Sequence, residues 1–205
     1  MGGAILVLSG PSGAGKSTII EKSSSYIGEY YFSISTTTRP PRDKERDGVD
    51  YYFVSKEEFE EDIKAGEFLE YAMVHGNYYG TSLKLVNKAL SEDKLVIFDI
   101  DIQGHRLVEA KMGDLVTSAF ITPSTLIELE KRLYARSTDD ISIIEKRVAN
   151  ARDEIKAINE FDFVIINDDI EKATTQFITI ANASRLKLST KELKKLIVNW
   201  ENIPS

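Results

Sequence analysis

Eight consecutive residues near the N-terminus have the types and spacing of a phosphate-binding loop. The segment Gly10-Pro11-Ser12-Gly13-Ala14-Gly15-Lys16-Ser17 matches the pattern GxxxxGK[ST] without a gap, and Thr18 follows it. Glycines let backbone N–H groups turn toward a phosphate, and a helix that starts there adds the positive end of its dipole. In such loops the lysine reaches the β- and γ-phosphates of a nucleotide, and the hydroxyl reaches magnesium. We therefore expect this segment to bind the phosphates of a nucleotide, with Lys16 in contact with them.

A second group of basic residues follows a short polar run. The segment Ser35-Thr36-Thr37-Thr38-Arg39-Pro40-Pro41-Arg42 places two arginines three positions apart, across a stiff pair of prolines. Guanidinium groups bind phosphate oxygens in pairs, and prolines limit the entropy that a loop loses on binding. The two arginines could clamp a second phosphate, and a solvated loop is the open alternative.

Further charged residues could complete a site for phosphate transfer. Asp99 ends an apolar run, and a carboxylate there can order Mg²⁺ through water, unless it makes only a structural hydrogen bond. Between residue 124 and about residue 152, helical-looking sequence carries Arg132, Arg136 and Arg147. These arginines predict a charged helical flap, with a solvated charged face as the alternative.

Short apolar runs rich in branched side chains must form the strands that hold these residues. The clearest runs stop at a polar residue and are typical of strands buried on both faces; they are residues 4–8, 95–99 and 163–167. Weaker candidates for the same sheet are residues 115–121 and 31–35. Because these runs alternate with helical stretches, they predict a parallel sheet covered by helices. Between about residues 36 and 92, glycines and prolines punctuate aromatic runs and predict an inserted lobe with partly antiparallel strands.

The composition excludes several classes of function. The chain has 205 residues, a net charge of -7, 42% hydrophobic and 29% charged residues, which indicates an ordinary globular protein without a broad nucleic-acid footprint. It has no cysteine and two histidines, so disulfides, thiolate nucleophiles and a histidine metal cluster are excluded. Its apolar runs are far shorter than the roughly 20 residues that span a bilayer, and no signal peptide is visible. We therefore expect a cytoplasmic protein that binds neither nucleic acid nor a membrane.

Five further segments resemble guanylate kinase in order and spacing, and with the phosphate loop the similarity covers about residues 4 to 185. They are Ser35–Arg42, Asp50-Tyr51-Tyr52-Phe53-Val54, Glu67-Phe68-Leu69-Glu70-Tyr71, Gly76-Asn77-Tyr78-Tyr79-Gly80-Thr81 and Asp99-Ile100-Asp101-Ile102-Gln103-Gly104. The resemblance implies a nucleoside monophosphate kinase that transfers the γ-phosphoryl group of ATP to GMP or dGMP with Mg²⁺. It also implies an α/β P-loop NTPase fold of three layers, with a parallel central sheet, an inserted mixed α+β lobe that binds GMP and a helical lid.

This resemblance assigns approximate boundaries along the chain. The core comprises residues 1–35, 93–123 and 153–186, the GMP-binding lobe residues 36–92, and the lid residues 124–152. A C-terminal helical tail occupies residues 187–205, where Ser189 and Glu192 fit a capping box and apolar residues recur at helical spacing. This tail helix either packs on its own domain or contacts a partner, and the chain is expected to be a monomer or a homodimer.

The resemblance also assigns roles to individual residues. The GMP phosphate is expected to contact Arg39, Arg42, Tyr51 and Tyr79. The guanine base is expected to be surrounded by Ser35, Glu70, Thr81 and Asp101, and Gly80 belongs to the same GMP site. On the ATP side, Arg132 and Asn167 join the phosphate loop, with Asn167 near the adenine. Arg136 and Arg147 are expected to close over the transferred phosphoryl group and act in catalysis with Lys16 and Arg42. One departure is Ser137, because the family usually has glycine there, and this predicts a stiffer lid hinge.

Two other kinds of protein share parts of this pattern. Asp101-Ile102-Gln103-Gly104 fits the DxxG segment of a GTPase switch, but no NKxD or TKxD guanine motif accompanies it. Guanylate kinase-like domains also occur as binding modules that no longer catalyse, typically with a degraded phosphate loop. Lys16, Ser17 and the arginines are present here, so catalysis is the favoured interpretation.

Overall fold

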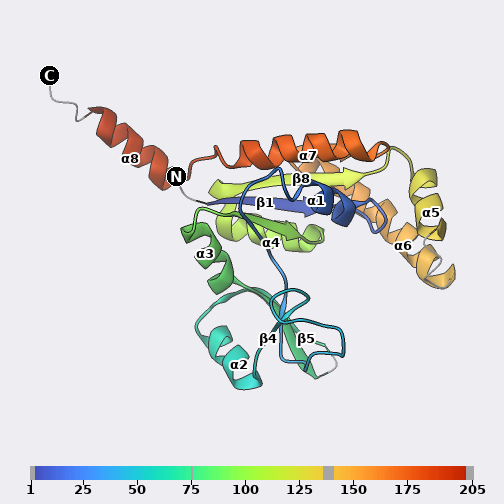
Figure 1. Ribbon diagram of the computed structural model, residues 1–205, viewed down its shortest axis with the longest axis horizontal. Coiled ribbons are helices and arrows are strands. Elements are labelled where there is room, and N and C mark those ends of the chain that lie inside the picture. Colours follow the sequence, from blue (N-terminus) through green and yellow to red (C-terminus); the bar gives the residue numbers. More distant parts are fainter. Residues whose placement is uncertain (1–2, 75, 136–140, 202–205) are drawn as a thin grey trace.

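The computed structural model describes residues 3–74, 76–135 and 141–201, and its centre is a parallel sheet of five strands in the order β2-β7-β1-β8-β9. The strands are β1 (Ala4–Ser9), β2 (Tyr30–Phe32), β7 (Leu95–Asp99), β8 (Val116–Thr122) and β9 (Phe163–Ile166). Every residue of β1 and β8 is buried, as expected for central strands covered on both faces. The strands end on one side of the molecule, next to α5 and α6 (Figure 1).

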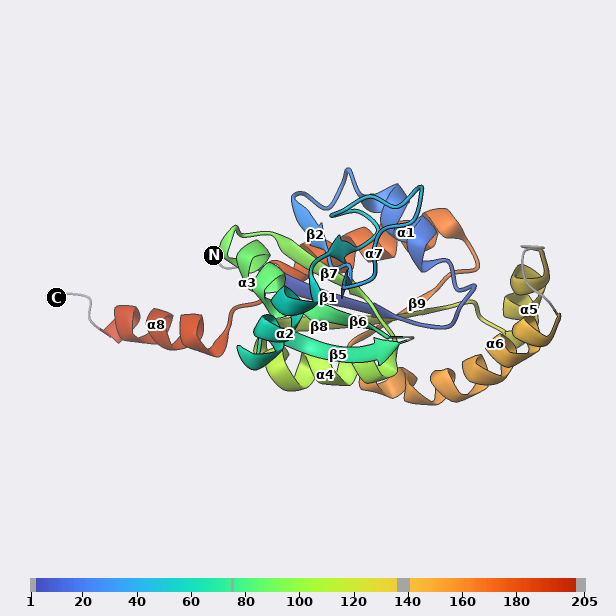
Figure 2. The same ribbon diagram turned by 90° about the horizontal axis from the view of Figure 1, so that it is seen from below.

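Helices cover both faces of this sheet (Figure 2). On one face α1 (Lys16–Ser23) and α7 (Ile170–Ser184) pack against Leu6, Leu8 and Ile97. On the other face α3 (Leu83–Ser91) and α4 (Ile102–Met112) pack against Ile5, Val7 and Phe98. Successive side chains of each strand thus pack in opposite helical layers, because side chains along a strand point alternately to the two faces of the sheet. The predicted three-layer α/β fold is confirmed.

A second, smaller sheet lies beside the main one and has the order β4-β3-β6-β5. Its strands are β3 (Thr36–Thr37), β4 (Tyr52–Phe53), β5 (Phe68–Val74) and β6 (Asn77–Ser82). β3 and β4 are parallel and the other pairs are antiparallel. The helix α2 (Lys56–Lys64) packs on this sheet through Phe59, whose ring stacks between Phe68 at 4.2 Å and Tyr78 at 5.0 Å. A mixed α+β unit therefore follows the first part of the core, as predicted.

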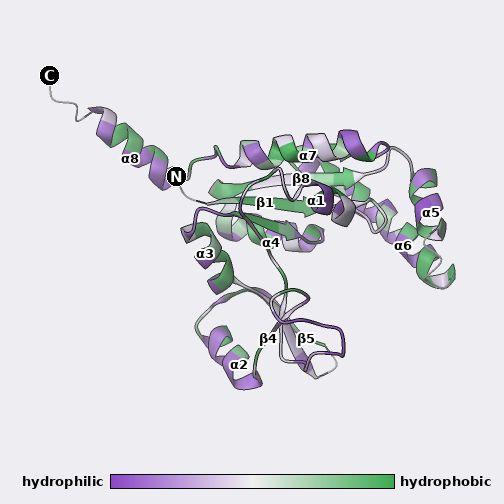
Figure 3. Cartoon of the chain, viewed as in Figure 1, coloured by the Kyte–Doolittle hydropathy of each residue, from purple (hydrophilic) through white to green (hydrophobic). Residues whose placement is uncertain are grey.

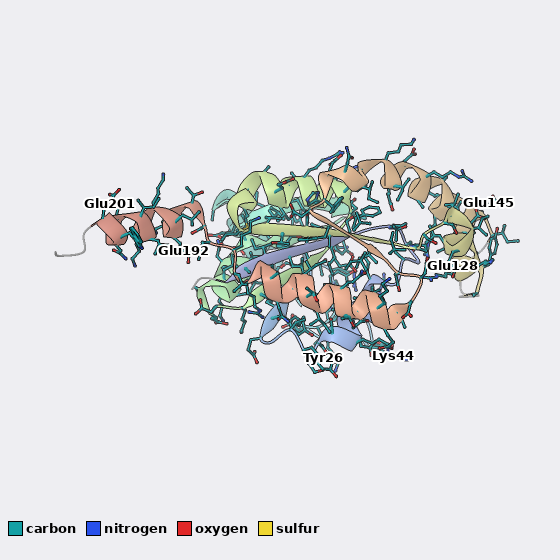
Figure 4. All side chains as sticks on the ribbon, turned by 90° about the horizontal axis from the view of Figure 1, so that it is seen from above. Tyr26, Lys44, Glu128, Glu145, Glu192 and Glu201 are labelled. Carbon is teal, nitrogen blue, oxygen red and sulfur yellow. The ribbon has the colours of Figure 1, made fainter. Side chains whose placement is uncertain are left out.

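Two helices form a separate unit at the carboxyl ends of the main strands (Figures 1 and 2). The pair α5 (Leu126–Ala135) and α6 (Ile141–Glu154) shares a small core of Leu129, Leu133, Ile144 and Ala151. Short 3₁₀ helices follow α4 and α6, namely η1 (Gly113–Leu115) and η2 (Ile155–Glu160). Figure 4 places Glu128 and Glu145 in this unit, at the end of the molecule opposite Glu192 and Glu201.

The last helix, α8 (Thr190–Glu201), projects away from the rest of the chain (Figures 1 and 3). Its start is capped as the sequence predicts, since the Ser189 backbone N–H and hydroxyl donate to Glu192 at 2.9 and 2.7 Å. Over residues 190–201 no side chain is buried, and Trp200 is 77% exposed. The expectation that this helix packs on its own domain is therefore wrong for the described residues. No helix within the described ranges is long and apolar enough to cross a membrane.

A buried histidine gives the core a dependence on pH. His105 on α4 is fully buried, and its ring stacks on Phe161 with the ring centroids 4.2 Å apart. Neither ring nitrogen has a hydrogen-bond partner in the described part of the chain. Burial lowers the pKa of His105, and this effect outweighs the opposing effect of three nearby carboxylates.

We expect the free energy of unfolding to fall as the pH drops below about 6.5. His105 then becomes protonated in the unfolded chain but stays neutral in the native protein, so protonation favours the unfolded state. The loss amounts to at most about 1.4 kcal/mol per pH unit, down to the lowered pKa of the native state. His105→Leu should remove this part of the slope. Urea unfolding of both proteins at pH values between about 7.5 and 5.5 measures it. Equal slopes for the two proteins would contradict the prediction.

Candidate active site

The phosphate loop connects β1 to α1 and depends on its glycines. Gly10, Gly13 and Gly15 have φ angles of +134°, +90° and +94°, which side chains with a Cβ rarely adopt. A Cβ on Gly10 would lie 2.0 Å from the carbonyl oxygen of Ile121, and one on Gly15 would lie 2.3 Å from Nδ2 of Asn167. Only glycine therefore lets the loop lie this close to β8 and to the residue after β9.

Lys16 lies at the start of α1, between the loop and the end of β7. Its Nζ donates to the Gly10 carbonyl oxygen at 2.5 Å and lies 3.7 Å from Oδ1 of Asp99. Burial raises the pKa of the Asp99 carboxyl, and the charge of Lys16 opposes that rise. Ser17 and Thr18 follow in the first turn of α1 and are exposed. Of the predicted metal-contacting residues, Asp99 thus lies beside the Lys16 ammonium group, and Ser17 directly follows Lys16 in α1.

Asn167 and Arg132 border a cavity on the other side of the loop. Nδ2 of Asn167 donates to the Ala14 carbonyl oxygen at 2.7 Å, and Nε of Arg132 donates to Glu128 at 3.0 Å. The cavity has a volume of about 420 Å³ and is lined by Gly13, Gly15, Thr18, Arg132, Ala135, Asn167, Asp168 and Ile170. The structure therefore brings Asn167 and Arg132 together with the phosphate loop at one cavity.

The helical unit of α5 and α6 contacts the phosphate loop. Nη1 of Arg147 on α6 donates to the Ser12 hydroxyl at 3.3 Å. Leu133 of α5 lies so close to Gly13 that a Cβ there would be 3.0 Å from its Cδ2. Arg136 and Ser137, which the sequence assigns to the lid, lie outside the described residues.

Aromatic side chains contact Arg39, which follows β3 of the smaller sheet. Its Nε donates to the Tyr79 hydroxyl at 3.2 Å, and its guanidinium carbon lies 5.4 Å from the centroid of the Tyr51 ring. The rings of Tyr51 and Tyr79 meet edge to face at 6.0 Å. Arg42 follows in the same loop with an exposed side chain. These four residues are the set expected at the acceptor phosphate, and the fold brings three of them into direct contact.

Three of the residues expected at the guanine base line one cavity of about 410 Å³. They are Glu70 on β5, Thr81 on β6 and Asp101 at the start of α4. The Thr81 hydroxyl donates to Oε1 of Glu70 at 2.7 Å, and the Asp101 side chain accepts from the Gly104 N–H at 2.8 Å. Leu69, Ile100 and Leu107 provide apolar walls.

Two further predicted residues of this site contribute in other ways. A Cβ on Gly80 would lie 2.8 Å from the Glu70 carbonyl oxygen, so glycine lets β5 and β6 approach here. Ser35 is not among the residues that line the cavity. Its backbone carbonyl accepts from the Tyr52 N–H at 3.0 Å and joins the segment before β3 to β4.

The sequence interpretation missed residues that hold the predicted ones in place. Glu45 accepts from Arg39, Glu128 accepts from Arg132, and the apolar cavity walls face Glu70. Glu128 lies four positions before Arg132, a helical spacing that could have revealed the pair. Glu45 and the cavity walls follow no such local rule.

The fold and the site define a P-loop nucleotide-binding protein with a second polar site opposite its phosphate loop. A family model described as guanylate kinase matches residues 3–184. The guanylate kinase of Sulfurimonas denitrificans is 55% identical over 201 residues, which are 98% of each chain. That of Wolinella succinogenes is 50% identical over 200 residues, covering 98% of this chain and 93% of that one. The crystal structure of guanylate kinase from Anaplasma phagocytophilum aligns with a TM-score of 0.67 at 32% identity, covering 99% of this chain and 97% of that one.

This chain therefore belongs to the guanylate kinase family. Membership over almost the whole chain confirms the predicted activity, which is the phosphorylation of GMP by ATP. ATP and GMP are accordingly its small-molecule substrates.

Proposed function

We propose that this kinase binds its two substrates at the two cavities described above and transfers the phosphoryl group between them with the aid of Mg²⁺. The observation that carries this assignment is the cavity shared by Glu70, Thr81 and Asp101. These residues come from three separate elements, β5, β6 and α4. Two acidic side chains and a hydroxyl between apolar walls suit a flat base that presents several N–H donors.

We assign the remaining residues to the substrates by their position. The phosphate loop, residues 10–18, holds the ATP phosphates, and Arg132 and Asn167 border the rest of ATP. The acceptor phosphate binds at Arg39, Arg42, Tyr51 and Tyr79. Of residues 36–92, the part before α3 then acts as the acceptor lobe, because α3 (Leu83–Ser91) packs on the main sheet. Residues 124–152 act as the lid. The contact of Arg147 with Ser12 supports this role of the lid, because it joins α6 to the phosphate loop.

Magnesium fits the oxygen donors around Lys16. No group of three or more His, Cys, Asp or Glu side chains that could hold an ion occurs in the described ranges. That is compatible with Mg²⁺, which keeps several waters and binds through substrate phosphates and one or two protein oxygens. The Ser17 hydroxyl would contact the ion and the Asp99 carboxylate would hold it through water. The bound ion supplies positive charge to the β- and γ-phosphates.

The residues of this chain have to align two anionic substrates rather than react with them. The GMP phosphate is itself the nucleophile and is already anionic near neutral pH, so no side-chain base is required. Lys16, Arg39, Arg42 and Arg147, with Arg136 by family resemblance, offset negative charge in a chain whose net charge is -7. Closure of the lobe and the lid would exclude water, which otherwise competes for the phosphoryl group. We further propose that the enzyme works in the cytoplasm, where ATP is the common phosphoryl donor.

A mass-resolved assay tests this function directly. The protein is mixed with ATP, MgCl₂ and GMP, and the formation of GDP and ADP is followed with and without EDTA. We expect equal amounts of both diphosphates, formed only with the metal. A binding module without catalysis would bind GMP but form no GDP, and this outcome would reject the proposal.

Arg42→Ala is expected to weaken GMP binding far more than ATP binding, because its proposed partner is the acceptor phosphate alone. Losing a charged, bidentate contact costs on the order of a hundredfold in affinity. Guanosine, which lacks the phosphate, should hardly be affected. Isothermal titration with GMP, guanosine and ATP measures the three affinities. Arg46→Ala is the matched control, since Arg46 is an exposed arginine of the same loop. An equal fall in ATP affinity would contradict the acceptor-lobe assignment.

A further inference from the structure

An acidic residue lies within the proposed clamp for the acceptor phosphate. Glu45 belongs to the loop between β3 and β4, and its carboxylate accepts three hydrogen bonds. Two come from Nη2 of Arg39, at 2.8 and 2.9 Å, and one comes from the backbone N–H of Arg42, at 2.8 Å. The side chains of Arg39 and Glu45 are only 13% and 19% exposed. Glu45 therefore contacts both arginines of the clamp in a shielded position.

This arrangement uses most of the hydrogen-bonding capacity of Arg39. Its Nε donates to Tyr79, its Nη1 donates to the Pro40 carbonyl at 2.8 Å, and its Nη2 donates to Glu45. A guanidinium has five N–H groups, and these contacts make four hydrogen bonds. Little capacity is left for a second bidentate contact. Arg39 is thus a fixed support: its four hydrogen bonds hold its side chain in place, and few of its N–H groups remain to bind a phosphate.

Arg42 has the opposite character. Its backbone is held by Glu45, and its exposed guanidinium makes no hydrogen bond to any described residue. The loop closes further where the Glu45 N–H donates to the Arg42 carbonyl at 2.9 Å. Because the guanidinium of Arg42 is exposed while its backbone is held in place, pairs of its N–H groups can form a fork that donates to two phosphate oxygens.

Glu45 is poorly suited to leave when a phosphate arrives. The hydrogen bond from the Arg42 N–H, together with Arg39, holds the pKa of the Glu45 carboxyl below its usual value, so it is ionised at neutral pH. Displacing it would leave a shielded carboxylate without its arginine partner, which is unfavourable because a shielded charge needs a hydrogen-bonded partner.

We propose that Glu45 is a positioning residue of the acceptor site, which fixes Arg39 as a support and Arg42 as the fork that grips the GMP phosphate. The proposal rests on the function proposed above and adds a division of labour between the two arginines. It predicts that removing the charge of Glu45 harms acceptor binding, although Glu45 and the phosphate are both negative.

Steady-state kinetics of Glu45→Gln test this inference. We expect the KM for GMP to rise roughly tenfold, the size of one lost charged hydrogen bond. The KM for ATP and kcat should stay within about twofold, because the chemical step and the other substrate are untouched. The matched control is Glu92→Gln, since Glu92 also pairs with a basic residue, Lys94, at 2.7 Å. A lower KM for GMP would show that Glu45 competes with the phosphate and would overturn the proposal. So would an unchanged KM with a lowered melting temperature, which is the result of a purely structural role.

A second pair of variants separates the arginines and remains decisive if Glu45→Gln does not fold. Lysine keeps the charge but cannot form a bidentate fork. We expect Arg42→Lys to raise the KM for GMP more than Arg39→Lys does, and the reverse order would overturn the proposal. Failure of the wild-type chain to form GDP would reject the proposed function instead, so the two failures are distinguishable.

Discussion

Replacement of Lys16 by methionine is expected to lower kcat by at least roughly a hundredfold, the range for loss of one preorganised group that stabilises charge. Nζ of Lys16 lies between the Gly10 carbonyl and Asp99, at the centre of the phosphate loop. From this position its ammonium group can stabilise the negative charge of the transferred phosphoryl group in the transition state. Methionine has a similar length and no charge, so the loop keeps its packing while that stabilisation disappears.

The affinity for GMP should survive this substitution, because Lys16 faces the other nucleotide. The measurements are kcat at saturating ATP and GMP, and the Kd for GMP from titration. Lys22→Met is the matched control, since Lys22 lies on the same helix and pairs at the surface with Glu171 at 2.6 Å. Near wild-type turnover in Lys16→Met would remove the catalytic assignment of the phosphate loop.

The phosphate loop and the central strands could be predicted from the sequence because their causes are local. The glycines at positions 10, 13 and 15 are required by positive φ angles, and the motif shows them directly. The fully buried strand β1 is a continuous apolar run, so it can be predicted as a central strand without knowing which strands pair with it. Its register against β7 and β8 follows only from the tertiary fold.

The contacts that assemble the site join segments far apart in the sequence, and spacing does not reveal them. The Arg147–Ser12 hydrogen bond spans 135 residues and the Asn167–Ala14 bond spans 153. The family resemblance placed these residues at one site, whereas their own pattern gave no pairing. The role of Glu45 could not be predicted for a related reason. The sequence pattern of an acidic residue in a polar loop is the same whether or not its carboxylate accepts hydrogen bonds from two arginines.

The tail shows where helical periodicity stops being informative. The apolar spacing of Leu193, Leu196, Ile197 and Trp200 correctly predicted a helix, and its cap at Ser189 was also correct. Periodicity identifies the apolar face of a helix but not the surface that covers it. The expectation of packing against its own domain failed at this second step.

The largest expected effect is on the selectivity for the base of the acceptor nucleotide. It follows from the acidic side chains of Glu70 and Asp101 in the cavity that they share with Thr81. Guanine presents an N1–H and an N2 amino group as donors beside the O6 acceptor. The Glu70 carboxylate can accept both donors, because a carboxylate has about four acceptor sites and the Thr81 hydroxyl uses one of them. That hydroxyl, which contacts Glu70 here, can also rotate to donate to O6. Adenine reverses two of these groups, so its N1 lone pair would face the Glu70 carboxylate.

We therefore expect kcat/KM to fall in the order GMP, IMP, AMP, with AMP poorer than GMP by roughly 10⁴–10⁵-fold. IMP keeps N1–H and O6 but lacks the amino group, so it loses one of the two donors expected to bind Glu70 and should be intermediate. Glu70→Gln should weaken GMP selectively, because a neutral amide oxygen accepts two donors less well than a carboxylate. The assay uses all three acceptors at saturating ATP, with Glu61→Gln on α2 as an exposed acidic control. A different order of acceptors, or an unchanged preference in Glu70→Gln, would show that this cavity does not select the base. The selection would then have to come from groups other than the acidic pair and the apolar walls, because apolar side chains offer no hydrogen bond that distinguishes guanine from adenine.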